Sequence, residues 1–244
     1  MNRQSLRMIL LLLSFSVFPI TVVYLAPAPP IMSLRAGVIN LSVLTILSIF
    51  ISGFIFRRAF CGWLCPGGGC QLVAQALNNR RIQNLKTNWF RVIIVSVWVF
   101  IMIATVVFRD QFPRLDVDHP GAGKFATANV RYFLPYIPVV VFIFLFIYLF
   151  GRRGFCHRGC WIYPLIATSS KLGTLVRLPS LYVSIKKSEE CKDCKFCTRV
   201  CPMSIDVYNH IKVNIKLPNN CIQCGLCIDK CPNDVLAFSF GIEK

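Results

Sequence analysis

The chain has 244 residues, of which 55% are hydrophobic, and its mean hydropathy is +0.60. It also carries a formal net charge of +17, from 27 Lys and Arg residues against 10 Asp and Glu residues. This combination disfavours a single soluble globular core. It predicts a membrane protein whose charges lie in loops and in a domain outside the bilayer.

Four segments are apolar enough to be transmembrane helices. They contain no acidic or basic side chain, and at about 1.5 Å rise per residue each can cross or nearly cross a hydrocarbon core of roughly 30 Å. The segments are residues 8–25, 36–56, 92–108 and 132–150. The first also has the charged flank of a signal peptide, but it is longer than the usual signal core. The predicted fold class is therefore an α-helical membrane protein with four transmembrane helices in two repeated hairpins.

Two similar stretches follow the second and the fourth of these segments. FRRAFCGWLCP covers residues 56–66, and GRRGFCHRGCW covers residues 151–161. If a helical turn continues past each apolar segment, cysteines four residues apart share one face. Two hairpins related by a pseudo-two-fold axis then bring four thiols together. We define these thiols as the four-cysteine site, and they belong to Cys61, Cys65, Cys156 and Cys160.

Three interpretations of the four-cysteine site are open at this stage. It binds an iron–sulfur cluster or another thiolate metal centre, or it is a dithiol–disulfide redox pair or metal relay. Alternatively, the cysteines only pack as small apolar residues. The neighbouring arginines favour the first two, because positive charge lowers thiol pKa values. A thirteenth cysteine, Cys70, follows the PGGG stretch and is either a substitute ligand or a free thiol.

The C-terminal part contains two complete cysteine runs. Both have the spacing C-x2-C-x2-C-x3-C-P, in which three cysteines bind one [4Fe–4S] cluster and the fourth binds the neighbouring cluster. Paired cysteines also build zinc sites, but two full runs ending in Cys-Pro favour clusters. We therefore assign a first [4Fe–4S] cluster to Cys191, Cys194, Cys197 and Cys231, and a second to Cys221, Cys224, Cys227 and Cys201.

The charges predict the orientation and the domains. Residues 57–91 hold six Lys or Arg and residues 151–188 hold seven, both without an acidic residue, whereas residues 109–131 hold three acidic residues. Positively charged loops stay in the cytoplasm, so we expect a multi-pass protein of the cytoplasmic (inner) membrane with both termini cytoplasmic. The predicted domains are a four-helix membrane module over residues 1–172, a linker over 173–187, and a cytoplasmic α+β ferredoxin domain with two [4Fe–4S] clusters over 188–244.

Together these motifs resemble a known family. FCGWLCPGGG, the second Cys-x3-Cys element and the ferredoxin runs are similar to membrane-bound ferredoxin-type proteins of the NapH/MauN kind and to the membrane half of NosR-type proteins. The resemblance covers almost the whole chain. It implies electron transfer between a quinol pool or a cytoplasmic donor and a partner redox protein. Trp161 departs from the pattern, which has proline after the second cysteine pair.

The expected function is membrane-bound electron transfer among the cytoplasmic clusters, a thiolate centre at the membrane edge, and a quinol pool or partner redox protein. The chain would then be a redox subunit of an oxidoreductase system, such as a quinol dehydrogenase component, with no catalytic residue of its own. The alternative is a maturation or assembly factor that reduces a metal or a thiol for a respiratory enzyme. The expected cofactors are two [4Fe–4S] clusters, a third cluster at the four-cysteine site, and a quinone. The expected partners are the lipid bilayer and ferredoxin-like or reductase subunits, and no nucleic acid.

Overall fold

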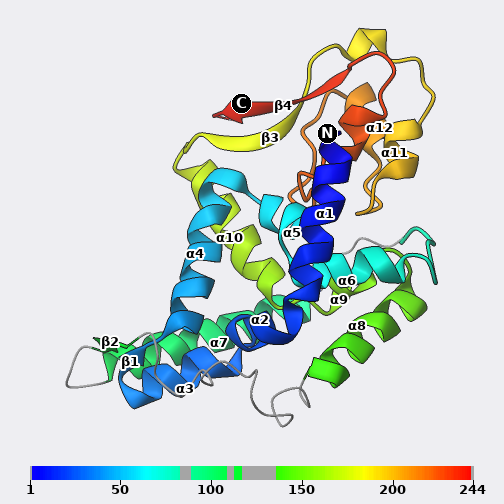
Figure 1. The fold of residues 1–244 in the computed structure, drawn as a ribbon. Coiled ribbons are helices and arrows are strands. Elements are labelled where there is room, and N and C mark those ends of the chain that lie inside the picture. Colours follow the sequence, from blue (N-terminus) through cyan, green and yellow to red (C-terminus); the bar gives the residue numbers. More distant parts are fainter. Residues whose placement is uncertain (1, 83–88, 109–112, 117–135, 243–244) are drawn as a thin grey trace.

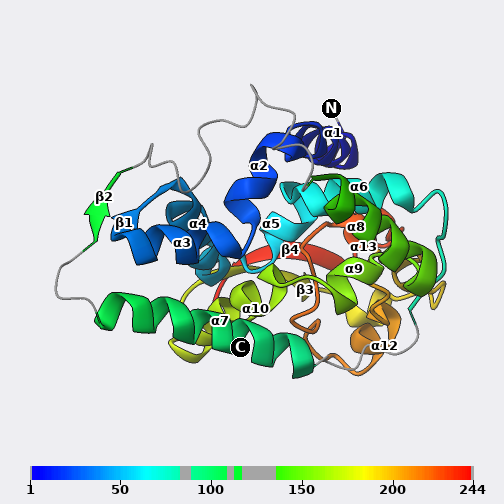
Figure 2. The same cartoon turned by 90° about the horizontal axis from the view of Figure 1, so that it is seen from below.

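The computed structural model describes residues 2–82, 89–108, 113–116 and 136–242. A helical part forms one end of the molecule, and the cysteine-rich C-terminal part packs on the other end, beside the N-terminus of α1 (Figure 1). In the view from below, α7 and α8 lie toward the viewer, on the side of the helical part away from the C-terminal part (Figure 2). The helices of this part are α1 (Arg3–Ser16), α2 (Phe18–Leu25), α3 (Ala28–Ala36), α4 (Leu41–Phe56), α5 (Ala59–Trp63), α6 (Pro66–Ala74), α7 (Trp89–Val107), α8 (Tyr136–Phe150), α9 (Gly154–Arg158) and α10 (Ile162–Leu175).

The prediction of four transmembrane helices is wrong. Within the part of the chain that the structure describes, no helix has both the length and the apolar character needed to cross a membrane. The segment 8–25 is divided between α1 and α2 at Val17, and Pro19 lies in the first turn of α2, where its missing N–H is tolerated. The segment 36–56 contributes only the 16 residues of α4, which is about 24 Å of helix.

Local signals set the start of α4. Gly37 adopts the left-handed conformation, with a φ of 80°, and ends α3. Asn40 caps α4 by accepting a hydrogen bond from the Val43 N–H. Between them lies β1 (Val38–Ile39), which pairs in parallel with β2 (Arg114–Leu115). The uniformly apolar segment 36–56 therefore contains the end of one helix, a short strand and the start of the next helix, which its hydropathy alone does not indicate.

The repeat seen in the sequence is also a repeat of structure. In each copy a residue with positive φ follows the long helix directly, namely Arg57 at 51° after α4 and Gly151 at 88° after α8, and Arg153 at 58° then directly precedes α9. A five-residue helix, α5 or α9, follows and carries the first cysteine of each pair. A further helix, α6 or α10, begins just after the second cysteine. We expected the long helix to continue into the cysteine motif. Instead it ends before the motif, and two further helices follow in each copy.

The C-terminal part is a small α+β unit. The antiparallel strands β3 (Ser180–Ile185) and β4 (Leu236–Gly241) pair over their full length and enclose the two cysteine runs in the sequence. The predicted linker 173–187 contains the end of α10 and all of β3. One buried apolar cluster includes Ile166 of α10 and Ile222 of the second run, so the two parts share a core. The remaining elements are η4 (Ser188–Glu190), α11 (Phe196–Val200), α12 (Val207–Lys212) and α13 (Leu226–Asp229).

Candidate iron–sulfur centres

The two ferredoxin runs have the same backbone path. Three positions in each run adopt the left-handed conformation, and each lies 30 residues from its counterpart. Such residues reverse the chain direction and let successive loops curve around a common centre. The pairs are Asp193 and Gln223, Lys195 and Gly225, and Ser204 and Asp234.

The structure brings the predicted ligands of the second cluster together. Cys201, Cys221, Cys224 and Cys227 all line one cavity, whose other walls are mainly apolar residues such as Val183 and Ile205. Burial and the neighbouring thiols raise the pKa of Cys221 to about 12 and that of Cys201 to about 11. These thiols are protonated at neutral pH in the metal-free chain, so iron binding must displace their protons.

The predicted first cluster lies nearer the surface. Cys197 is buried and interacts electrostatically with Cys191 and Cys194, and Cys194 is exposed. Cys197 also interacts with Cys227 of the second set, so the two sites are neighbours. The assignment of Cys231 to the first set is based on sequence spacing and stays a prediction.

The four-cysteine site is also assembled. Besides burial, the thiols of Cys61, Cys160 and Cys156 raise the pKa of Cys65 well above its ordinary value, and this mutual interaction places all four thiols together. Burial and the neighbouring thiols raise the pKa of Cys160 to about 12. Matching hydrogen bonds shape both motifs. The Cys65 N–H donates to the Phe60 carbonyl and the Cys160 N–H to the Phe155 carbonyl, each at 2.9 Å.

Residues distant in the sequence complete this site, and the sequence analysis missed them. Gln71 of α6 is fully buried and donates from Nε2 to Cys156 Sγ at 3.0 Å, while its Oε1 accepts from the Cys156 N–H at 3.3 Å. Arg91 of α7 donates to the Cys156 carbonyl at 3.0 Å. The ring of Tyr163 of α10 contacts two guanidinium groups, whose Cζ atoms lie 4.5 Å (Arg58) and 4.6 Å (Arg91) from its centroid. Only tertiary packing brings these side chains together, and no local pattern marks them.

Buried positive charge surrounds the four thiols. Arg58 and Arg153 are each 1% exposed, and Arg91 is 8% exposed. The Nε atom of each has no hydrogen-bond partner among the described residues. An uncompensated buried guanidinium costs several kcal/mol, so this cluster fits an anionic group. An iron–sulfur cluster with four thiolate ligands is such a group.

The chemistry of the donors therefore fits a cluster. Within the described ranges, no three His, Cys, Asp or Glu side chains gather closely enough to hold a single metal ion. In a [4Fe–4S] cluster each cysteine binds a different iron, so its ligands do not share one ion. Bound at these sites, such clusters would supply one-electron transfer, and the thiols, the arginines and the apolar walls would hold them and exclude water.

Two other residues from the sequence analysis take different places. Cys70 is fully buried among Ala74, Ile143 and Ile147, in a cluster separate from the core that contains Cys61, Cys156 and Cys160. Burial raises its pKa to about 12. His157 lies beside the four-cysteine site, and burial followed by the nearby arginines lowers its pKa to about 4. The imidazole is therefore neutral at physiological pH.

Comparison with protein families agrees with this arrangement of cysteines. A model described as a 4Fe-4S dicluster domain matches residues 179–242. A model described as a 4Fe-4S binding domain matches residues 38–82 and 133–179, the two segments that contain the Cys-x3-Cys motifs. Both parts of the chain that contain the cysteine motifs are therefore similar to domains that bind 4Fe-4S clusters.

Two curated proteins are similar to the chain over most of its length. The chain is 26% identical over 196 residues to the methylamine utilization ferredoxin-type protein MauN of Methylobacillus flagellatus, which covers 76% of this chain and 62% of MauN. It is 26% identical over 182 residues to Protein NirI of Paracoccus denitrificans, which covers 70% of this chain and 25% of NirI. No solved structure matches. The chain is thus similar to the ferredoxin-type protein MauN and to NirI over most of its own length, and it spans less than two thirds of the length of either relative.

Proposed function

We propose that the chain transfers electrons through three centres: the two ferredoxin clusters and a third [4Fe–4S] cluster bound by Cys61, Cys65, Cys156 and Cys160. The observation that carries the third centre is the group of buried arginines around four converging thiols, for which no carboxylate partner is found among the described residues. The match of a 4Fe-4S binding domain to both motif segments supports it. A dithiol pair would leave most of this buried positive charge uncompensated.

Iron and acid-labile sulfide counts on anaerobically purified protein test this proposal. About twelve irons per chain are expected, against about eight if only the ferredoxin runs bind clusters. The double variant Cys61→Ser/Cys65→Ser should drop to about eight and lose one EPR species. Cys70→Ser is the matched control, because Cys70 lies outside the four-cysteine site, and it should keep about twelve. A wild-type count near eight would reject the third centre.

A cavity beside the four-cysteine site supports a second, finer proposal, namely that an apolar redox ligand of the quinone class exchanges electrons there. Its volume is about 470 Å³, within the usual range for ligand pockets. Cys65 and Cys160 form part of its wall, and aromatic rings of Phe142, Phe155 and Trp161 form another part. A flat apolar ring in this cavity would lie against two ligands of the third centre.

Calorimetric titration of a short-chain naphthoquinone into the holoprotein tests this ligand. Val139→Trp should abolish binding, because Val139 lines the cavity and the indole would fill it. Val141→Trp places the same side chain on an exposed position of α8 and should bind as the wild type does. Equal binding by both variants would exclude this cavity as the ligand site. Absence of binding to the wild type would instead leave a protein partner as the electron acceptor or donor.

A further inference from the structure

The loop between the first two ligands of the second cluster lies directly on the four-cysteine site. Gly62 stands between Cys61 and Cys65. A Cβ atom at this position would come within 2.2 Å of the Ile222 carbonyl oxygen and 3.7 Å of the Cys224 Cα. The backbone of α5 therefore touches the backbone between Cys221 and Cys224, and only glycine leaves room for this approach.

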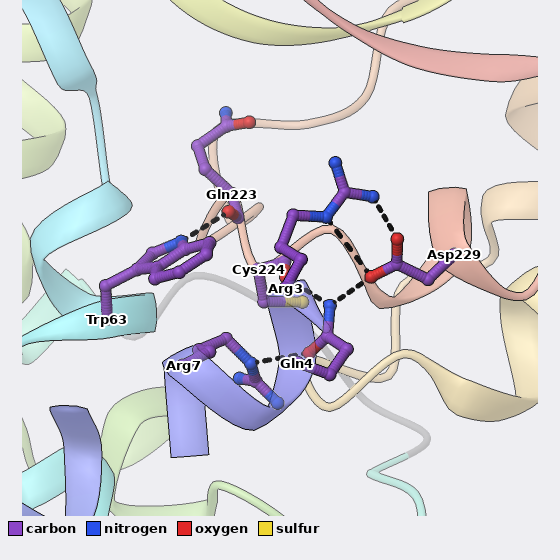
Figure 3. A network of polar contacts seen from close by, with 7 residues as sticks. All are labelled: Arg3, Gln4, Arg7, Trp63, Gln223, Cys224 and Asp229. Atoms are coloured by element: carbon purple, nitrogen blue, oxygen red, sulfur yellow. Dashed lines mark hydrogen bonds and ion pairs between the residues drawn. The ribbon is translucent and has the colours of Figure 1, made fainter. Parts of the chain in front are cut away.

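Hydrogen bonds from separate elements hold the same loop. The indole Nε1 of Trp63 donates to the Gln223 carbonyl at 2.9 Å, and Gln4 of α1 donates from Nε2 to the Cys224 carbonyl at 3.0 Å. Figure 3 shows both side chains directed at this loop, Trp63 from α5 and Gln4 from α1. Arg58 donates to the Asn220 carbonyl at 2.8 Å, so the loop is fixed along residues 220–224.

Arg58 also connects the two centres electrostatically. Its guanidinium interacts with Cys61 and Cys156 of the four-cysteine site. It also interacts with Cys221, where its positive charge partly opposes the rise in pKa that burial causes. Tyr163, stacked on Arg58, donates from its hydroxyl to the Asn220 Oδ1 at 2.8 Å. One buried positive charge is thus shared between ligands of two different centres.

The first ferredoxin set adjoins the second, because Cys197 interacts with Cys227. Its ligand Cys194 is exposed, and Cys191 and Cys231 are half-buried. Where Arg152 of the helical part reaches the first run, it donates to the carbonyls of Arg199 and Cys201, and Cys201 is the residue that crosses to the second cluster. The first set is therefore nearest to solvent, whereas each of the other two sets has three buried cysteines and one half-buried cysteine.

We infer a fixed linear order of three centres, in which the second ferredoxin cluster alone exchanges electrons with the four-cysteine centre across the contact of Gly62 and Trp63 with residues 222–224. The first cluster is then the exchange point for an external redox partner. This inference rests on the proposed third centre. In each step one centre is oxidised by one electron and its neighbour is reduced by the same electron, and no bond or proton changes.

The test compares two Trp→Phe variants of the full holoprotein. Trp63→Phe removes the hydrogen bond to Gln223, whereas Trp98→Phe removes an equivalent bond to the Pro27 carbonyl, at 2.8 Å, away from this contact. Rapid mixing with dithionite followed by freeze-quench EPR records the order in which the centres are reduced. EPR of the fully reduced protein records their magnetic interaction. We expect Trp63→Phe to slow reduction of the four-cysteine centre several-fold and to weaken its interaction with the second cluster, with Trp98→Phe unchanged.

Gly62→Ala is a stronger variant, and Tyr163→Phe, which removes the bond to Asn220, is a milder one that retains the ring. Tyr163→Phe should give the same pattern if Trp63→Phe loses iron. Equal behaviour of Trp63→Phe and Trp98→Phe with about twelve irons bound, or reduction of the four-cysteine centre ahead of the second cluster, would overturn the inferred order alone. A count of about eight irons would instead remove the third centre, and with it the proposed function, before any kinetic comparison.

Discussion

Gly53 of α4 lies against Ser169 of α10, and a Cβ atom at residue 53 would come within 2.0 Å of the Ser169 Oγ. Ser169 is fully buried and donates to the Ile166 carbonyl at 3.0 Å, so its hydroxyl is not free to move away. This close approach of α4 and α10 positions the helix that precedes one cysteine motif against the helix that follows the other.

We expect Gly53→Ala to lower the free energy of unfolding by about 1–3 kcal/mol, because the added methyl group forces the two helices apart. Chemical denaturation followed by circular dichroism measures the change. A double-mutant cycle with Ser169→Gly supplies the control, since removal of the facing side chain should recover part of the loss. Strictly additive effects of the two substitutions would show that residues 53 and 169 are not in contact.

Asp229 joins the N-terminus of α1 to the second cysteine run. Its carboxylate forms an ion pair with Arg3 and accepts a hydrogen bond from Gln4 Nε2 at 2.5 Å (Figure 3). Partial burial acts to raise the pKa of Asp229, but the bonds from Arg3 and Gln4 outweigh it and lower the pKa. The ion pair therefore contributes fully above the unfolded-state pKa of about 4 and is lost as the pH falls through the lower folded-state value.

Asp229→Asn should cost about 0.5–1 kcal/mol at low salt, because both partners are partly exposed and solvent screens their attraction. Thermal melting of the holoprotein at low and high ionic strength measures this loss, which should shrink as salt is added. Asp234→Asn, an exposed aspartate of the same domain, is the control and should have little effect. If the stability loss did not depend on salt concentration, the negative charge of Asp229 would not be the source of its contribution.

Tyr163 combines a hydroxyl bonded to Asn220 with a ring that contacts both Arg58 and Arg91. We expect Tyr163→Phe to cost about 1 kcal/mol, the usual net value of one hydrogen bond. Tyr163→Leu should cost about 1–2 kcal/mol more, because it also removes two cation–π contacts. Urea denaturation of both variants separates the two contributions. Equal losses would show that the ring contributes no more than a similar apolar volume.

The proximity of the cysteines was the most predictable part of the molecule, because the spacing within each run is local in the sequence. Cys221, Cys224 and Cys227 lie within seven residues, and the return of Cys201 to them follows from the spacing of the fourth cysteine. The repeat of Arg-Arg-x-Phe-Cys-x3-Cys likewise predicted that four thiols separated by up to 99 residues would meet.

The helix lengths were not predictable from hydropathy. An apolar window records composition only, whereas Val17, Gly37 and Arg57 mark interruptions that depend on single backbone conformations. The polar shell of the four-cysteine site was equally hidden. Gln71 and Cys156 are 85 residues apart, so their contact exists only after α6 and α9 have packed.

Because the arginines are buried, we expect removal of one of their charges to destabilise the iron-bound protein but not the iron-free protein. Arg153 is 1% exposed, its Nη1 lies 3.5 Å from the Cys61 carbonyl, and its Nε has no partner among the described residues. With an anionic centre bound, Arg153→Met removes one partner of a buried ion pair and should cost about 3–5 kcal/mol. After chelation of the iron, the same substitution removes an uncompensated buried charge and should leave the melting temperature unchanged or raise it.

Differential scanning calorimetry of the iron-bound and iron-free forms measures the change in melting temperature, and Arg177→Met, at an exposed position, should affect neither form. Equal destabilisation of the two forms by Arg153→Met would mean that Arg153 stabilises the protein fold alone and does not balance the charge of a bound centre.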